Sequence, residues 1–236
     1  MLVDNVALLF GATARSQAYL QAMAKAGLMP ECCILFASSK EDFYGQHGER
    51  DAYTDRSERL VDTLERCKIP FHILEERDIN SEAAAEAISS LSQKYIVYSG
   101  YGGVILKPHL FHLGKRYIHV HAGILPKYRG STTAYYSMLQ EGCIGATAIF
   151  LNEGIDQGDV LFRETYPVPE GETDFDYAYE PWVRGQVLVK TLEKYVKEGK
   201  FQAVPQGNSG AETYYIIHPV LKHLAMLKAG KGSSGE

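Results

Sequence analysis

The chain has 236 residues, of which 45% are apolar and 22% are charged, and its formal net charge is −5. This length and composition are typical of a globular protein with one sizeable core and room for an appendage. The negative balance argues against nucleic acid as a partner, because phosphate backbones bind basic surfaces. No apolar run is long enough to cross a bilayer, so no membrane partner is expected.

The cysteines and the two ends of the chain give weaker signals. The spacing of the four cysteines fits no zinc site: Cys32, Cys33, Cys67 and Cys143. We interpret them as reduced thiols, which predicts a cytoplasmic protein. The N-terminal apolar run lacks a preceding basic region and is interpreted as a strand, not a signal peptide. Residues 229–236 are rich in Gly and Ser and are interpreted as a flexible tail or an expression remnant.

Strand and helix patterns alternate along the first half of the chain. One of the helical patterns begins after Ser81 and ends near Gln93. Such alternation predicts an α/β fold with a doubly wound, mostly parallel sheet. Short apolar runs predict its first five strands at residues 6–10, 33–37, 70–74, 95–99 and 117–121.

The pattern changes after Gly130. A helix is predicted at residues 133–139, followed by two longer strands, GATAIFL and DVLFRETYPV, joined by the turn NEGIDQG. This pair is compatible with an antiparallel β-hairpin at the edge of the sheet. An amphipathic helix is predicted from about residue 174 to 197. The expected organisation is a main domain over residues 1–168, with a C-terminal helical extension over 169–228 packed on it.

Candidate catalytic residues gather where the fifth predicted strand ends. In open parallel sheets, ligands bind beyond the carboxyl ends of the strands. The stretch HVHAGILPKYRG places His119 and His121 on one face of that strand, at this edge. The later turn NEGIDQGD carries Asp156 among glycines. A metal site and two ordinary strand-capping histidines are the alternatives to a catalytic group formed by these three residues.

The run HVHAGILPKYRG, followed by GATAIFLNEGIDQGDVLF, resembles the core of the formyltransferases that use 10-formyltetrahydrofolate, and of the related deformylases. The pattern of that family is Asn-x-His, an apolar stretch ending in Leu-Pro-x-Tyr-Arg-Gly, a Gly-x-Thr strand and Asp-x-Gly-Asp. The resemblance covers about residues 6–168 and is densest over 99–161. It implies a Rossmann-like formyltransferase fold and an enzyme with 10-formyltetrahydrofolate as co-substrate.

The resemblance also implies roles for individual residues. His121 and Asp156 match the catalytic histidine and aspartate of the family. The loop that holds the folate pterin and the turn that shapes the site match Gly100, Tyr101, Gly102, Gly103, Val104, Ile105, Leu106 and Leu125. Two positions depart from the pattern. His119 replaces the asparagine, and Ile149 stands where a histidine is often found.

Formyl transfer to an amine passes through a tetrahedral intermediate, which needs an oxyanion donor and a group that moves a proton. His121, oriented by the Asp156 carboxylate, is predicted to polarise the formyl carbonyl or to carry the proton. An imidazole N–H of His119 is the predicted substitute for the asparagine amide. Either His119 has taken over that role, or the chemistry differs from that of the family.

The acceptor is expected to be a primary amine on a small molecule, with a nucleotide-linked amino sugar as the first candidate. The sequence predicts acceptor contacts at Arg129, Tyr128 and Arg15, because guanidinium groups suit phosphate or carboxylate. The tRNA enzymes of this family carry a further C-terminal domain, and the residues after Val168 are too few for one. A homodimer is compatible with the sequence.

Several functions remain open at this point. The alternatives to formyl transfer are a formyl hydrolase on the same scaffold, a binding protein with altered catalysis, and a metal enzyme that uses His119, His121 and Asp156. The sequence identifies neither the acceptor amine nor the transferred group. It also leaves open whether His119 is the oxyanion donor, and in which oligomeric state the protein exists.

Overall fold

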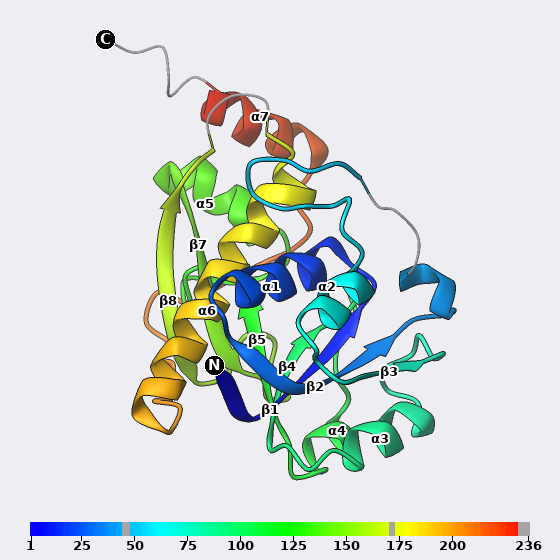
Figure 1. Ribbon diagram of the computed structural model, residues 1–236. Coiled ribbons are helices and arrows are strands. Elements are labelled where there is room, and N and C mark those ends of the chain that lie inside the picture. The colour runs from blue at the N-terminus through cyan, green and yellow to red at the C-terminus, as the bar shows by residue number, and fades with distance from the viewer. Residues whose placement is uncertain (44–47, 170–172, 231–236) are drawn as a thin grey trace.

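The central sheet is mostly parallel. The computed structural model describes residues 1–43, 48–169 and 173–230. Within these ranges, seven strands form one sheet in the order β3-β2-β1-β4-β5-β7-β8 (Figure 1). The parallel part confirms the predicted doubly wound sheet. It consists of β3 (Phe71–Leu74), β2 (Met29–Phe36), β1 (Leu2–Gly11), β4 (Tyr95–Ser99) and β5 (Arg116–His121).

The predicted hairpin forms the other edge of the sheet. Strand β7 (Cys143–Phe150) runs antiparallel to β5 and to β8 (Val160–Pro167). Thr147 of β7 is fully buried, and its hydroxyl donates to the Gly123 carbonyl at 2.6 Å. The same oxygen accepts from the Leu125 amide at 3.1 Å. The threonine of the Gly-x-Thr motif therefore anchors the loop that follows β5.

Helices cover both faces of the sheet (Figure 1). One face carries α1 (Ala14–Lys25), α2 (Leu60–Arg66) and α6 (Glu180–Glu198), and the other carries α3 (Glu82–Ser89) and α4 (Pro108–Phe111). Side chains of a strand alternate between the two layers. Leu8 and Phe10 belong to the apolar cluster on the α1 side, whereas Leu9 belongs to the one on the α3 side.

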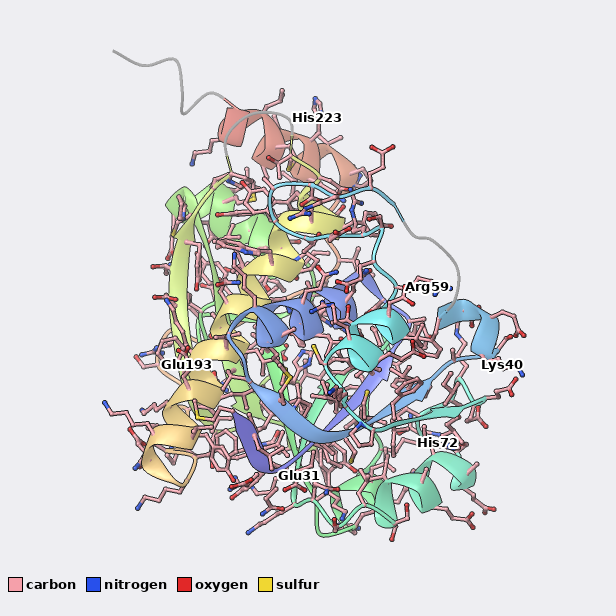
Figure 2. The ribbon with its side chains drawn as sticks, viewed as in Figure 1. Glu31, Lys40, Arg59, His72, Glu193 and His223 are labelled. Carbon is pink, nitrogen blue, oxygen red and sulfur yellow. The ribbon has the colours of Figure 1, made fainter. Side chains whose placement is uncertain are left out.

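Polar side chains surround these layers. In Figure 2, the side chains of Lys40, Glu193 and His223 lie at the periphery of the molecule, and all three are exposed. Lys40 opens a short 3-10 helix, η1 (Lys40–Phe43). Across the described ranges, no helix combines the length and the apolar character that a membrane span would need.

Two predicted helices differ from the structure in their bounds. Ser81 caps α3 as expected, through a bond from the Ala84 amide at 3.2 Å. The helix ends at Ser89 and not near Gln93, because the Ser90 hydroxyl donates to the Ala87 carbonyl and competes with a further turn. The helix expected from residue 174 begins with a π-helical turn, η2 (Phe175–Tyr179), which leads directly into α6.

The residues after α6 return to the sheet and were not predicted to do so. Val204 pairs with Val160 of β8, and β9 (Glu212–Tyr214) pairs in parallel with β6 (Tyr128–Gly130). We call residues 204–214 the C-terminal strap. Beyond the strap, α7 (Pro219–Gly230) lies against α5 (Thr133–Glu141).

A close contact between two helices generates a first prediction. A side chain at Gly185 of α6 would lie 3.2 Å from the Ala18 carbonyl and from the Ala22 methyl group of α1. Gly185→Leu should therefore lower the free energy of unfolding by about 1–3 kcal/mol through overpacking. Urea denaturation followed by circular dichroism measures this change. Gly207→Ala is the control, because nothing lies within 4 Å of a side chain there, and its stability should stay within about 0.5 kcal/mol of the parent.

Candidate active site

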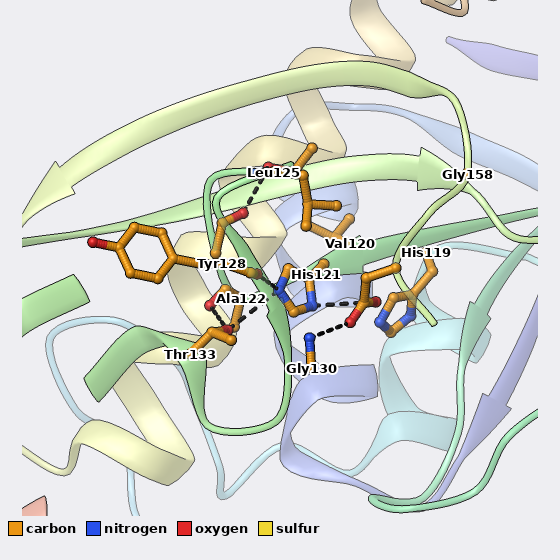
Figure 3. A network of polar contacts seen from close by, with 12 residues as sticks. His119, Val120, His121, Ala122, Leu125, Tyr128, Gly130, Thr133 and Gly158 are labelled. Carbon is orange, nitrogen blue, oxygen red and sulfur yellow. Dashed lines mark hydrogen bonds and ion pairs between the residues drawn. The ribbon is translucent and has the colours of Figure 1, made fainter. Parts of the chain in front are cut away.

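An ion pair between His121 and Asp156 lies beyond the carboxyl end of β5. The imidazole Nδ1 of His121 is 3.3 Å from one carboxylate oxygen of Asp156, and both side chains are largely buried. The second carboxylate oxygen accepts the Gly130 amide at 2.9 Å. In Figure 3, the dashed lines from His121 and from Gly130 end on the two oxygens of this carboxylate. The strand end and the Asp-x-Gly-Asp turn, far apart in sequence, are thereby joined.

The turn that carries Asp156 has an uncommon backbone conformation. Asp156 has φ of 52°, in the left-handed region that only a small share of residues other than glycine adopt. Two residues later, a side chain at Gly158 would lie 1.6 Å from the Phe150 carbonyl, so only glycine fits. Strained residues of this kind persist where neighbouring contacts hold them, often at functional sites.

The second nitrogen of His121 also faces an acceptor. Its Nε2 lies 2.6 Å from the Tyr128 carbonyl and 3.2 Å from the Thr133 hydroxyl, which itself donates to the Ala122 carbonyl. A ring that carries both protons satisfies all of these contacts. Burial alone would raise the pKa of Asp156, but His121 and the Gly130 amide lower it to about 2. The pair is thus best satisfied as imidazolium and carboxylate.

His119 stands in a different environment, although it lies on the same strand. Its Nε2 is 3.3 Å from a guanidinium nitrogen of Arg184, and its Nδ1 is 3.5 Å from the Tyr98 carbonyl. A guanidinium can only donate, so Nε2 is the accepting nitrogen and the proton resides on Nδ1. Burial and then Arg184 lower the pKa of His119 well below its ordinary value. His119 is therefore neutral near pH 7, and its N–H is directed at a backbone carbonyl.

Arg184 is buried on α6 and connects that helix to β5. Its Nε donates to the Val120 carbonyl at 2.7 Å, and its Nη1 pairs with Glu180 at 2.8 Å. Burial alone would lower the pKa of Arg184, but Glu180 and Tyr19 raise it above its ordinary value. A permanently charged group therefore adjoins His119.

Two cavities meet at this constellation. The first, which we call the apolar cavity, has a volume of about 130 Å³ and is lined by side chains such as Ile105, Leu106 and Leu151. The second, the polar cavity, has a volume of about 350 Å³ and is lined by charged groups that include Arg15, Arg184 and Glu180. Four residues line both: Tyr98, Val104, His119 and Asp156.

The loop after β4 lies between the two cavities. Of the residues predicted to bind folate, Val104, Ile105 and Leu106 line the apolar cavity, and residues 101–104 line the polar one. Gly100 accepts a hydrogen bond from Arg15 through its carbonyl. Leu125, in the loop after β5, is fully buried and lines neither cavity.

The predicted acceptor-binding residues separate in space. Arg15 lines the polar cavity, where its Nε donates to the Ser99 hydroxyl at 3.0 Å. Tyr128 is fully buried and stacks on Tyr214. Arg129 is buried too, and its Nη2 donates to the Gln206 side chain at 3.1 Å. Tyr128 and Arg129 line neither of the two cavities, and Arg15 lines the polar one.

The C-terminal strap holds the Asp156 turn from outside. The amide of Gln206 donates to the Asp156 carbonyl at 3.0 Å and to the Gly158 carbonyl at 2.6 Å. Its carbonyl oxygen accepts from Arg129. Arg129 therefore contacts the strap that braces the turn, and not either cavity.

Sequence reasoning missed Arg184 and Gln206. The first left a detectable signal, because Arg184 stands on the apolar stripe of α6, between the buried residues Val183 and Val187. A charged residue at such a place is rare unless it is paired or functional. Gln206 left none, since it lies in a polar segment with no periodicity.

The geometry does not match the hypothesis of a metal site formed by His119, His121 and Asp156. Across residues 1–43, 48–169 and 173–230, no three His, Cys, Asp or Glu side chains are grouped so as to hold a metal ion. His119, His121 and Asp156 lie within these ranges. Their nitrogens and oxygens are instead engaged with one another and with Arg184, Tyr128 and Gly130.

Comparisons with known proteins agree on one family. The family model for formyl transferases matches residues 4–180. A methionyl-tRNA formyltransferase from Synechococcus sp. (strain JA-3-3Ab) is 33% identical over 149 residues, which make up 62% of this chain and 44% of that protein. The chain spans less than half the length of the curated relatives it matches.

Solved structures show the same fold. The N-formyltransferase from Helicobacter canadensis superposes with a TM-score of 0.61 at 18% identity, over 95% of this chain and 80% of that one. Phosphoribosylglycinamide formyltransferase from Bacillus halodurans gives a TM-score of 0.55 at 19% identity, over 83% and 96% of the two chains. Because the family model matches well over half of the sequence, the chain belongs to the formyl transferase family.

Proposed function

We propose that this chain transfers a formyl group from 10-formyltetrahydrofolate to a primary amine of a small molecule. The observation that supports this most strongly is the Asp156–His121 pair, whose carboxylate faces both cavities. A flat ring system suits the apolar cavity, and an amine suits the polar one. A formyl group carried on folate in the first would meet a nucleophile held in the second.

Folate as donor is further supported by the loop after β4 and by related structures. Glycines at 102 and 103 allow a ring to approach the backbone closely, and the apolar side chains at 104–106 follow directly. The Helicobacter canadensis enzyme was crystallised with folinic acid and dTDP-3-aminofucose. A nucleotide-linked amino sugar, the candidate named from the sequence, is accordingly one example of such a primary amine.

The proposed reaction is an acyl transfer through a tetrahedral intermediate. The amine nitrogen attacks the formyl carbon, whose bond to the folate nitrogen then breaks. The amine becomes a formamide, and the departing folate nitrogen takes up one proton in return for the N–H lost. An acceptor that enters as an ammonium ion first loses one more proton. Asp156 is proposed to hold the ammonium and to pass this proton on to solvent.

The positive charges around the intermediate would stabilise its oxyanion. His121, held between the Asp156 carboxylate and the Tyr128 carbonyl, places an imidazolium next to the reacting centre. Arg184 adds a second fixed cation beside His119. Preorganised charge in a largely buried site is the most effective form of such stabilisation. His119 is proposed to form the wall between the donor and the acceptor in its neutral form.

The direct test is to incubate the protein with 10-formyltetrahydrofolate and a panel of primary amines. Formamide formation that depends on both substrates is expected, and mass spectrometry detects it. Loss of the formyl group without an acceptor would identify a hydrolase instead. Absence of both activities, together with no folate binding by calorimetry, would refute the proposal.

A substitution at Asp156 tests its proposed role. Asp156→Asn keeps the size of the side chain and a residue type that tolerates left-handed φ, but removes the charge. Loss of a proton-transfer group should lower kcat by about 10²–10⁴ with a smaller change in KM. Glu153→Gln removes an exposed charge three residues away and outside both cavity linings, so its kcat should match the parent. Equal kcat values in both variants would exclude this role for Asp156.

The same carboxylate predicts a pH dependence of stability. Its pKa is lowered from 3.8 to about 2 in the folded protein, so its contribution is present above pH 3.8 and is lost as the pH falls toward 2. The shift corresponds to about 2 kcal/mol. The difference in free energy of unfolding between the parent and Asp156→Asn should therefore be larger at pH 6 than at pH 2 by about this amount. Urea titrations at both pH values provide the measurement, and a constant difference would contradict it.

A further inference from the structure

Two arginines lie together in the polar cavity, and the charge of one is not matched by a carboxylate. Arg184 pairs with Glu180 at 2.8 Å. Arg15 donates to the Ser99 hydroxyl and to the Gly100 carbonyl, both of them neutral. Among the described residues, Arg15 forms no ion pair within 4.0 Å. Burial and then Arg184 lower the pKa of Arg15 to about 10. Arg15 is half-buried, and a cation partly removed from water without a carboxylate partner is costly, so a bound anion would offset that cost.

The hydroxyl of Tyr98 is a second polar group in this cavity that a ligand could satisfy. Tyr98 lines the polar cavity, and Arg15 acts on it electrostatically. The Tyr98 hydroxyl is buried, with no hydrogen-bond partner in the described part of the chain. Buried polar groups in folded proteins are nearly always paired, by protein, water or ligand. A hydroxyl without a hydrogen-bond partner, on Tyr98, and a guanidinium without a carboxylate partner, on Arg15, therefore belong to the lining of the same cavity.

Besides Glu180, which pairs with Arg184, two further carboxylates line the same cavity. Asp156 and Asp176 both line it. Asp176 contacts Lys222 and the Tyr135 hydroxyl, and its side chain is 45% exposed. An ammonium group would be attracted to these two residues, whereas an anion would be attracted to Arg15 and Arg184. His119 lines the same cavity in its neutral form and contacts Arg184, so it adds no charge to either group.

We propose that the acceptor is a compact amine that carries its own anionic group, a carboxylate or a phosphate, which Arg15 and Arg184 bind while the amine lies at Asp156. This inference rests on the proposed formyl transfer and narrows its acceptor. The anion and the amine are recognised within one cavity of about 350 Å³, near the lower limit for ligand pockets. A nucleotide-linked sugar, which carries its charge on a distant diphosphate, fits this arrangement less well than an amino acid or an aminoalkyl phosphate.

The test compares amines in matched pairs that differ in the anion alone. Glycine is paired with glycinamide, and O-phosphoethanolamine with ethanolamine. At least one anionic member should be formylated with kcat/KM about 10- to 100-fold above its neutral partner, because hydrogen bonds to charged groups are the stronger ones. The pair with the larger ratio distinguishes carboxylate from phosphate. Equal kcat/KM within both pairs would overturn the proposal and leave formyl transfer intact.

Variants then test whether Arg15 is responsible for this preference. Arg15→Gln should reduce the anionic-to-neutral ratio to near one, and Arg15→Lys should retain part of it, because charge remains and the planar fork is lost. Lys25→Gln, at the exposed end of the same helix, removes one cation away from the site and should keep the full ratio. A full ratio in Arg15→Gln would also overturn the proposal. Thermal unfolding and calorimetric binding of 5-formyltetrahydrofolate verify that each variant is folded and retains its donor site.

Binding measurements separate this inference from the proposed function. Calorimetry with glycine and with O-phosphoethanolamine requires no turnover. If the protein formylates no amine but binds one of the two, and Arg15→Gln abolishes that binding, the anion subsite stands and the transfer reaction fails. If neither ligand binds and neither is formylated, the subsite is refuted whatever other amine the enzyme uses.

Discussion

The Asp156 carboxylate is the point on which the rest of the site depends. One oxygen faces His121 at the end of β5, and the other accepts the amide of Gly130 in β6. The backbone carbonyl of Asp156 accepts from Gln206 in the C-terminal strap. An aspartate with left-handed φ is retained only where its surroundings hold it there. Here three segments, each at least 26 residues from Asp156 in sequence, supply those surroundings.

The two histidines show how environment assigns chemistry. His119 and His121 are the same residue type, two positions apart on one strand, and both line the polar cavity. His121 faces acceptors at both nitrogens, whereas His119 faces a guanidinium at one. A doubly protonated ring satisfies the contacts of His121, whereas burial and then Arg184 lower the pKa of His119. Arg184 belongs to α6.

Local sequence patterns predicted most of the fold and part of the site. The apolar runs at β4 and β5 and the hairpin of β7 and β8 were predicted, because side-chain alternation and turn residues are local properties. The position of Asp156 near His121 followed from the family pattern. The contact of His119 with Arg184 did not, since 65 residues separate them in sequence. The pairing of β6 with β9 also depends on contacts that no local periodicity encodes.

The C-terminal strap has a consequence for the time at which the site is completed during synthesis. A chain emerges from the ribosome N-terminal end first, and its domains fold as units. His121 and Asp156 are made early, and so is the whole region that the family model covers, residues 4–180. The Asp156 turn receives its contacts from Gln206 only after a further segment has been made. A nascent chain that ends before the strap thus contains the whole region that matches the family model, yet it still lacks part of the support for its central carboxylate.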